Sequence, residues 1–182
     1  RVGGGFTLIE ALIAITIVTF AITGPLLSAH RSIISAQDSN LQLTASHLAQ
    51  EGIEHVRAMR DNYYLEAYRD SFTDPTIDPA TVGWAAFLAS IASCGTSCTL
   101  DPTKPMGVGS SLESCASCQA LYLDPTTKVY SQSTLSPKTP FTRTIQVISV
   151  SPNEARIVSK VSWSFHAIPD SITITNRLTP WQ

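Results

Sequence analysis

Four cysteines are the residues whose spacing most directly suggests chemistry. They form two close pairs, Cys94-x-x-x-Cys98 and Cys115-x-x-Cys118, within a proline-rich stretch. An even number of cysteines in a loop-rich segment is typical of disulfides, each of which contributes about 2–4 kcal/mol to stability. We therefore expect two disulfides. Of the three possible pairings we favour Cys94 with Cys118 and Cys98 with Cys115.

Two other roles for these cysteines have to be weighed. Four thiolates in two knuckle-like pairs are also a ligand set for tetrahedral zinc, which stays an alternative to the disulfides. Redox catalysis by the Cys115-Ala116-Ser117-Cys118 segment is not favoured, because no βαβ pattern surrounds it. We expect no cofactor, with zinc as the minority alternative.

Glu10 is the second chemically unusual residue, because it is the single ionisable group in the 22 residues from 6 to 27. A helix of that length spans roughly 33 Å and matches a bilayer core of about 30 Å. An ionised carboxylate in such a segment costs about 2.5–3.5 kcal/mol unless a cation pairs with it. The segment therefore predicts a transmembrane helix whose carboxylate needs a partner.

Cleavage of the chain would create that cation. Gly3, Gly4 and Gly5 supply the unhindered, extended backbone that a peptidase requires. A cut after Gly5 leaves a free amino group on Phe6, four residues before Glu10 and on the same helix face. The simpler alternative is that the Glu10 carboxylate only reaches up to the membrane surface.

The segment Gly5-Phe6-Thr7-Leu8-Ile9-Glu10 resembles the prepilin processing motif of type IV pilins and type II secretion pseudopilins. The resemblance implies that a prepilin peptidase cuts after Gly5 and methylates the new N-terminus at Phe6. It also implies that Glu10 serves filament assembly, and that residues 1–5 are the remnant of a leader. Many pilins carry helix breakers in this helix, and we expect Gly24 and Pro25 to cause a kink or local melting.

Residues 28–70 have the pattern of an amphipathic helix. Apolar or small residues recur every three or four positions, as expected for one buried helix face. They are Leu41, Ala45, Leu48, Gly52, Val56, Met59 and Tyr63. The intervening Gln50-Glu51 and Arg57-Arg60-Asp61 groups are expected on a solvated face. His30, His47 and His55 have no ligand-spaced partners and are expected to be ordinary surface residues.

Residues 71–140 form a Cys- and Pro-rich loop region of the predicted globular head. Seven of the 11 prolines lie there, which limits regular structure. Asp78-Pro79 has the composition of an N-cap and first turn, and predicts a short helix that ends before Cys94. Residues 120–123 and 128–131 flank a turn sequence and predict a β-hairpin.

Residues 141–182 alternate with the period of two that is typical of strands. Three strands are expected, joined by turns at Ser151-Pro152-Asn153 and Ile168-Pro169-Asp170, as an antiparallel sheet whose apolar face is covered by the amphipathic helix. The predicted fold class is therefore α+β. A long N-terminal helix packed on a C-terminal antiparallel sheet also resembles the pilin fold.

Composition argues against other classes of function. The formal net charge is -2, and no stretch concentrates Lys and Arg, so direct nucleic-acid binding is not predicted. No phosphate-binding loop, nucleophile set or carboxylate pair stands at a recognisable spacing, so an enzyme is not predicted.

We therefore expect a structural subunit of a type IV pilus-like extracellular filament. Its expected partners are other pilin subunits, the prepilin peptidase, an inner-membrane assembly platform and, before assembly, the membrane. It would be a single-pass membrane precursor that ends on the cell surface. The alternatives are a pseudopilin of a type II secretion system and a single-span anchored zinc-binding module.

Overall fold

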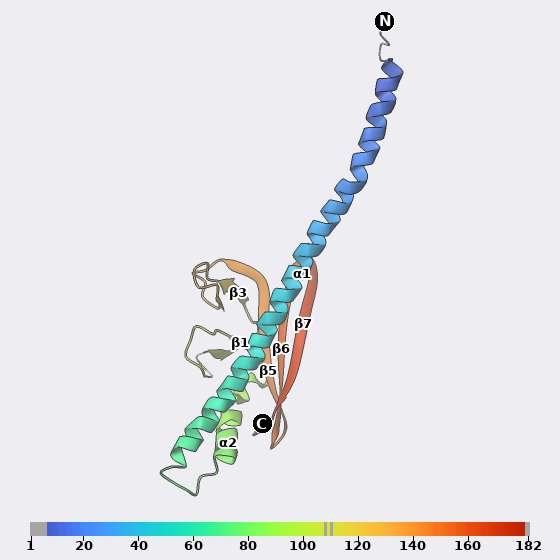
Figure 1. Ribbon diagram of the computed structural model, residues 1–182. Helices are drawn as coiled ribbons and strands as arrows, with labels where there is room; N and C mark the ends of the chain where they lie inside the picture. Colours follow the sequence, from blue (N-terminus) through green and yellow to red (C-terminus); the bar gives the residue numbers. More distant parts are fainter. Residues whose placement is uncertain (1–6, 108, 110, 181–182) are drawn as a thin grey trace. The chain divides into compact units, whose positions relative to one another are not determined.

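The computed structural model describes residues 7–107, 109 and 111–180 of the 182-residue chain. Its contacts divide it into two compact units, Arg1–Leu41 and Gln42–Gln182, which are considered separately below as the N-terminal and C-terminal units. A long apolar N-terminal helix and an antiparallel sheet in the C-terminal unit make the fold α+β, as the sequence predicted (Figure 1).

Helix α1 (Leu8–Asp70, 63 residues) begins directly after Thr7. The backbone N–H of Glu10 donates to the Thr7 carbonyl at 3.1 Å and lies 3.4 Å from the Thr7 hydroxyl oxygen. Thr7 therefore occupies the N-cap position and Glu10 the third helical position, the spacing of a capping box. The predicted cleavage residues Gly5 and Phe6 lie outside the described residues.

The helix continues through Gly24 and Pro25, so of the two outcomes expected there, a kink or local melting, the melting is absent from this structure and the kink stays a prediction. Figure 1 shows α1 as an unbroken coil in this blue region. A proline inside a helix removes its own N–H as a donor, and its ring crowds the carbonyl of the preceding turn. The turns before and after Pro25 keep their other hydrogen bonds, and this is enough to maintain the helix.

The second half of α1 belongs to the C-terminal unit and is amphipathic, as predicted. Along the predicted stripe Ala45, Leu48, Gly52, Val56 and Met59 are buried. These residues recur at helical spacing and therefore face one side, where they contribute to the core.

A seven-stranded antiparallel sheet is the other main part of the C-terminal unit, within the described residues. Its strands are β1 (Cys98–Leu100), β2 (Leu112–Ser114), β3 (Ala120–Leu123), β4 (Tyr130–Ser131), β5 (Lys138–Ser151), β6 (Glu154–Phe165) and β7 (Ile168–Leu178). The long strand β5 pairs with β1 and β3 along one edge and with β6 along the other. The hairpin β3–β4 and the meander β5–β6–β7 confirm the predicted strands, whereas β1 and β2 are too short for their periodicity to be recognised.

The turn between β6 and β7 differs from the prediction. The chain reverses at His166 and Ala167, whose φ angles are 49° and 66°, and Ile168 already belongs to β7. Two consecutive residues with positive φ match the right-handed twist of the flanking strands. Pro169 is tolerated inside β7 because β7 is an edge strand that, among the described residues, pairs with β6 alone. The backbone N–H that proline lacks is therefore not needed on the unpaired side of β7.

Helix α2 (Pro79–Ser90) confirms the predicted short helix. Its N-cap is Asp78, whose Oδ1 accepts the N–H of Ala80 at 3.2 Å. The Trp84 indole N–H donates to the Pro152 carbonyl at 2.7 Å, which fixes α2 to the β5–β6 turn. After α2 a short 3-10 helix, η1 (Ala92–Gly95), leads into β1.

Gly52 sets how closely α1 approaches the sheet. A Cβ atom built on Gly52 would lie 2.6 Å from Ser159 Oγ and 3.2 Å from Ile145 Cδ1. Those side chains belong to β6 and β5, which lie beside the teal half of α1 in Figure 1. The absence of a side chain at this position therefore allows the helix to rest directly on the central strands.

We predict that Gly52→Ala lowers the free energy of unfolding by about 1–3 kcal/mol, because the methyl group overlaps Ser159 Oγ. Chemical unfolding in mild detergent, followed by tryptophan fluorescence, measures this change. Gly95→Ala is the matched control, since nothing lies within 4 Å of a Cβ there. Ser159 Oγ is buried without a hydrogen-bond partner, so adding Ser159→Ala should restore most of the loss. Equal losses in the single and double variants would contradict the predicted overlap.

Candidate functional site

The first candidate site is the surface of α1 in the N-terminal unit. Within the described residues one helix is long and apolar enough to cross a membrane, and none of the residues in its most apolar 18-residue window is buried. Large side chains such as Leu8, Ile13, Phe20 and Leu26 are between half and four-fifths exposed. Contiguous exposed apolar surface of this kind is unusual in a soluble monomer and marks a contact with lipid or protein.

The threonine hydroxyls of this segment are satisfied within the helix itself. Thr16, Thr19 and Thr23 donate to the carbonyls of Ile13, Thr16 and Phe20 at 2.8, 2.8 and 2.9 Å. A hydroxyl that bonds to the preceding turn needs no water or partner chain. These residues are therefore compatible with a surrounding that contains no water.

Glu10 is the exception in this segment. It is exposed, and among the described residues no side chain pairs with its carboxylate. The proposed cation, the amino group of Phe6 after cleavage, lies outside the described residues. The pairing of Glu10 therefore stays a prediction.

The four cysteines form two disulfides, but with a different pairing from the one we favoured. Cys94 bonds to Cys98 and Cys115 bonds to Cys118, with Cα–Cα distances of 5.2 and 5.1 Å. The correction has a local cause: η1 turns the chain so that Cys94 returns to Cys98, and the turn after β2 does the same for Cys115 and Cys118. The Cys94–Cys98 bridge is fully buried in the core, whereas Cys115 and Cys118 are half-buried.

The disulfides also bear on the zinc alternative. All four sulfur atoms are engaged in S–S bonds, so none of them is a thiolate ligand in this structure. Among the described residues no group of three or more His, Cys, Asp or Glu side chains is arranged to hold a metal ion.

The second candidate site is a buried polar cluster around Arg143, which sequence reasoning missed. The Arg143 side chain on β5 is completely buried. Its Nη1 donates to Glu51 Oε2 at 2.5 Å and to the Leu48 carbonyl at 3.2 Å, and its Nη2 donates to the Leu100 carbonyl at 3.0 Å. One guanidinium group therefore ties β5 to α1 and to β1.

A signal for this residue was present in the sequence. Phe141, Ile145 and Val147 alternate along the strand with the period of two that marks one face, and Arg143 falls between them in the same period. An arginine on an apolar face requires an internal partner. The partner was hidden because Glu51 had been assigned to the solvated face of the helix.

His55 lies one helical turn after Glu51 and is also not an ordinary surface residue. It is half-buried, and its Nε2 lies 2.8 Å from Ser111 Oγ in a hydrogen bond. Burial lowers the pKa of His55 below its usual 6.5, and the positive charge of Arg143 lowers it further against the opposing effect of Glu51. The imidazole is therefore held in its neutral form.

Asp101 completes the cluster from the loop that follows β1. It is buried, and its Oδ1 accepts the backbone N–H of Thr103 at 3.1 Å while its Oδ2 accepts that of Gln132 at 3.4 Å. Its negative charge acts on Arg143 in the same direction as that of Glu51. Two carboxylates therefore balance one buried guanidinium.

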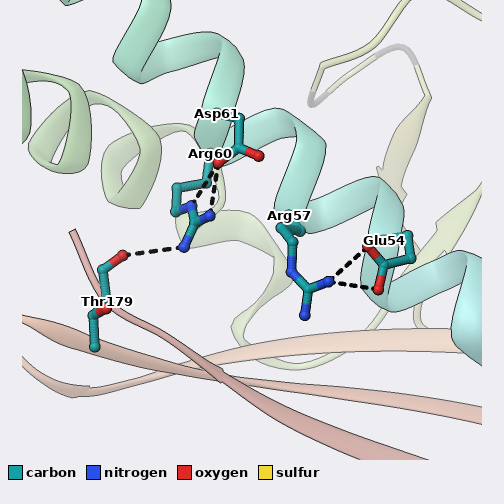
Figure 2. A network of polar contacts seen from close by, with 5 residues as sticks. All are labelled: Glu54, Arg57, Arg60, Asp61 and Thr179. Carbon is teal, nitrogen blue, oxygen red and sulfur yellow. Dashed lines mark hydrogen bonds and ion pairs between the residues drawn. The ribbon is translucent and has the colours of Figure 1, made fainter. Parts of the chain in front are cut away.

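Figure 2 shows the polar contacts farther along α1, where one assignment to the solvated face holds and another is wrong. Arg57 pairs with Glu54 at 2.7 Å in a partly exposed arrangement. Arg60, by contrast, is buried, with its Nη2 2.7 Å from Asp61 Oδ1 and its Nη1 3.4 Å from the Thr179 carbonyl. The chain after β7 covers Arg60, and that contact follows from the tertiary fold rather than from helix periodicity.

Family models, curated proteins and solved structures were compared with the chain, and none of them matches it.

We predict that Glu51→Ala lowers the free energy of unfolding by roughly 3 kcal/mol, because it leaves the buried Arg143 charge without its direct partner. Glu54→Ala is the matched control, because it removes the same residue type about one helical turn away. The exposed pair of Glu54 with Arg57 should contribute less than about 1 kcal/mol. Denaturant titrations of the two variants provide the comparison. Similar small losses in both would show that Arg143 does not depend on Glu51.

We also predict that the C-terminal unit loses stability at mildly acidic pH through His55. In the unfolded chain His55 takes up a proton near pH 6.5, while the folded unit resists protonation to lower pH. Its contribution is complete above pH 6.5 and declines as the pH falls through the lowered pKa of the folded state. His55→Gln should flatten this part of the stability profile between pH 5 and 7.5, and the exposed His47→Gln should leave it unchanged.

Proposed function

We propose that the chain is a structural subunit of a type IV pilus-like extracellular filament, cut after Gly5 and assembled through the N-terminal part of α1. The single observation that carries the proposal is the combination of the Gly5-Phe6-Thr7-Leu8-Ile9-Glu10 segment with an apolar helix whose side chains are exposed. The proposal takes Glu10, at a set distance from the glycine cleavage site, as the partner of the new N-terminal amino group.

The exposed side chains of this helix are compatible with two successive environments, a membrane and then a filament. Its apolar side chains suit lipid before assembly and the neighbouring helices of a filament afterwards. The hydroxyls of Thr16, Thr19 and Thr23 stay bonded within the helix in either place, so transfer from lipid to filament breaks none of those hydrogen bonds. The carboxylate of Glu10 is the group whose free energy differs most between lipid and filament, because an ionised carboxylate is costly in an apolar environment unless a cation pairs with it.

In this mechanism cleavage and assembly depend on one another. Removal of residues 1–5 creates the amino group of Phe6, and the Glu10 carboxylate pairs with that group on the same chain or on a neighbouring subunit. An ion pair in a dry helix bundle sets the axial position of each subunit, because an unpaired charge there costs several kcal/mol.

We place the subunit in a pilus rather than in a secretion pseudopilus. The connection from α1 to β5 carries α2, η1, four short strands and both disulfides. A surface-displayed subunit has more use for such stabilised loops than a subunit confined to the cell envelope. N-terminal analysis of the cellular protein tests the processing step: a chain that begins at methylated Phe6 is expected, and a retained Gly5 would contradict it.

We predict that Glu10→Val leaves cleavage intact but reduces incorporation into filaments at least tenfold. The measurement is the amount of subunit in sheared filaments relative to that in membranes, with the N-terminus checked by mass spectrometry. Thr19→Val is the matched control, because it also replaces a polar residue of the segment by valine and its hydroxyl bonds only within the helix. Normal incorporation of the Glu10 variant would refute the pairing.

A further inference from the structure

The outer face of the β5–β6–β7 meander carries three cations, of which one is paired inside the unit. Arg156 and Lys160 on β6 and Arg177 on β7 are all exposed. Residues on this face alternate with the buried Ile157, Ser159 and Val161, so they point away from α1. We refer to Arg156, Lys160 and Arg177 as the basic sheet face.

The register places like charges next to each other on this face. Arg156 stands directly opposite Arg177 in the β6–β7 pairing. Arg177 is neutralised by Glu154 at 2.7 Å, whereas no ion pair to Arg156 or Lys160 is present among the described residues. The remaining cross-strand neighbours include Thr144 and Thr173, which flank Lys160. Like charges directly opposite in a sheet are unfavourable, and Glu154 offsets this at Arg177, so Arg156 and Lys160 are the cations of this face that have no ion pair among the described residues.

A surface of opposite character lies at the C-terminal end of α1. Tyr68 and Phe72 are 46% and 73% exposed, and their rings meet edge to face with centroids 5.0 Å apart. The carboxylates of Glu66, Asp70 and Asp74 are exposed around them. We refer to these five residues as the acidic aromatic end.

The charge of this end is negative at physiological pH. Hydrogen bonds from the Thr76 hydroxyl and backbone N–H lower the pKa of Asp74 below its usual value. Arg69 is the one cation among the neighbouring residues of this helical turn, so three carboxylates outnumber it. Exposed aromatic faces bordered by carboxylates are suited to receive guanidinium and ammonium groups.

The two surfaces do not meet within one copy of the chain. The acidic aromatic end lies where α1 finishes, and α1 packs against the inner face of the sheet through Gly52, whose neighbours are Ser159 and Ile145. The basic sheet face is on the other side of that sheet. Each surface is therefore available to another molecule.

We propose that the acidic aromatic end of one copy docks on the basic sheet face of a second copy. In this contact Arg156 and Lys160 approach the carboxylates of Asp70 and Asp74, and a cation lies against the Tyr68 or Phe72 ring. Two different surfaces that complement each other form a head-to-tail contact, which extends into an open polymer wherever successive rotations do not close a ring. The inference rests on the proposed filament function and adds a contact between C-terminal units to the one made by the helices.

The opposite charges of the basic sheet face and the acidic aromatic end favour a second copy of the chain, rather than a polyanion, as the partner of the basic sheet face. A nucleic acid would be attracted by Arg156 and Lys160 but repelled by the three carboxylates of the same unit. A second copy of the chain satisfies both surfaces at once. Nucleic-acid binding is therefore treated as an outcome that would overturn the proposal.

Charge reversal in the full processed chain tests the contact. Lys160→Glu and Asp74→Lys should each lower filament yield roughly tenfold, and the double variant should recover most of that yield because the pair is restored with exchanged signs. Lys128→Glu, the same charge change in the exposed β3–β4 turn, is the matched control and should assemble normally. Tryptophan fluorescence of each subunit in detergent verifies that the fold is unchanged.

Cross-linking supplies an independent measurement. A carbodiimide should join Lys160 of one copy to Asp70 or Asp74 of another in wild-type filaments, and this link should be absent from dissociated subunits. Normal yield and normal salt resistance of the Lys160→Glu filaments would overturn the contact. The contact would also be overturned if the sole defect of that variant were a loss of binding to a single-stranded oligonucleotide.

The failure of the contact is distinguishable from failure of the proposed function. If wild-type protein forms filaments that depend on Glu10 but not on Lys160, the helix-based assembly stands and the contact between C-terminal units is wrong. If the wild type is never cleaved after Gly5 and never forms filaments, the proposed function is wrong, and the contact fails with it.

Discussion

The buried guanidinium of Arg143 is the interaction on which the C-terminal unit most depends. It lies in the middle of β5 and bonds to Glu51 and the Leu48 carbonyl on α1 and to the Leu100 carbonyl on β1. A buried cation is unfavourable unless it finds partners with good geometry, and both terminal nitrogens of Arg143 have them although its Nε does not. Helix, long strand and short strand are therefore held in one register, because a shift of any of them would leave the charge without partners.

Close packing around this cluster follows from the same requirement. Gly52 stands one residue after Glu51 and lets α1 approach Ser159 without a side chain between them. His55, one turn farther along, is held neutral by burial and by the nearby Arg143, and it bonds to Ser111 in the loop before β2. A single helical stretch thus carries the partner of the charge, the closest contact with the sheet and a pH-sensitive contact with the loops.

The N-terminal unit differs in that its threonine hydroxyls are satisfied inside the helix although its side chains are exposed. The threonines achieve this through the preceding helical turn, and Glu10 does not. A helix with this property stays intact in lipid or among other helices, and it leaves one carboxylate to depend on its surroundings. The two units therefore depend on different interactions: the N-terminal unit exposes its apolar side chains, and the buried charge of Arg143 links the helix and the strands of the C-terminal unit.

The sequence by itself determined the features that depend on neighbouring residues. These are the apolar segment, the amphipathic stripe from Ala45 to Met59, the capped helix after Asp78 and the meander of β5, β6 and β7, because periodicity and capping are local. Tertiary structure decided the partner of Arg143, the burial of Arg60 beneath Thr179 and the turn at His166 and Ala167, which carries no glycine or asparagine to mark it. It also decided the pairing of the cysteines, since spacing along the chain does not tell how η1 folds Cys94 back on Cys98. The partner of Arg143 and the burial of Arg60 depend on groups that meet only after the helix and the sheet have packed. The cysteine pairing and the turn at His166 and Ala167 are local, but no residue type in the sequence marks the backbone conformation that produces them.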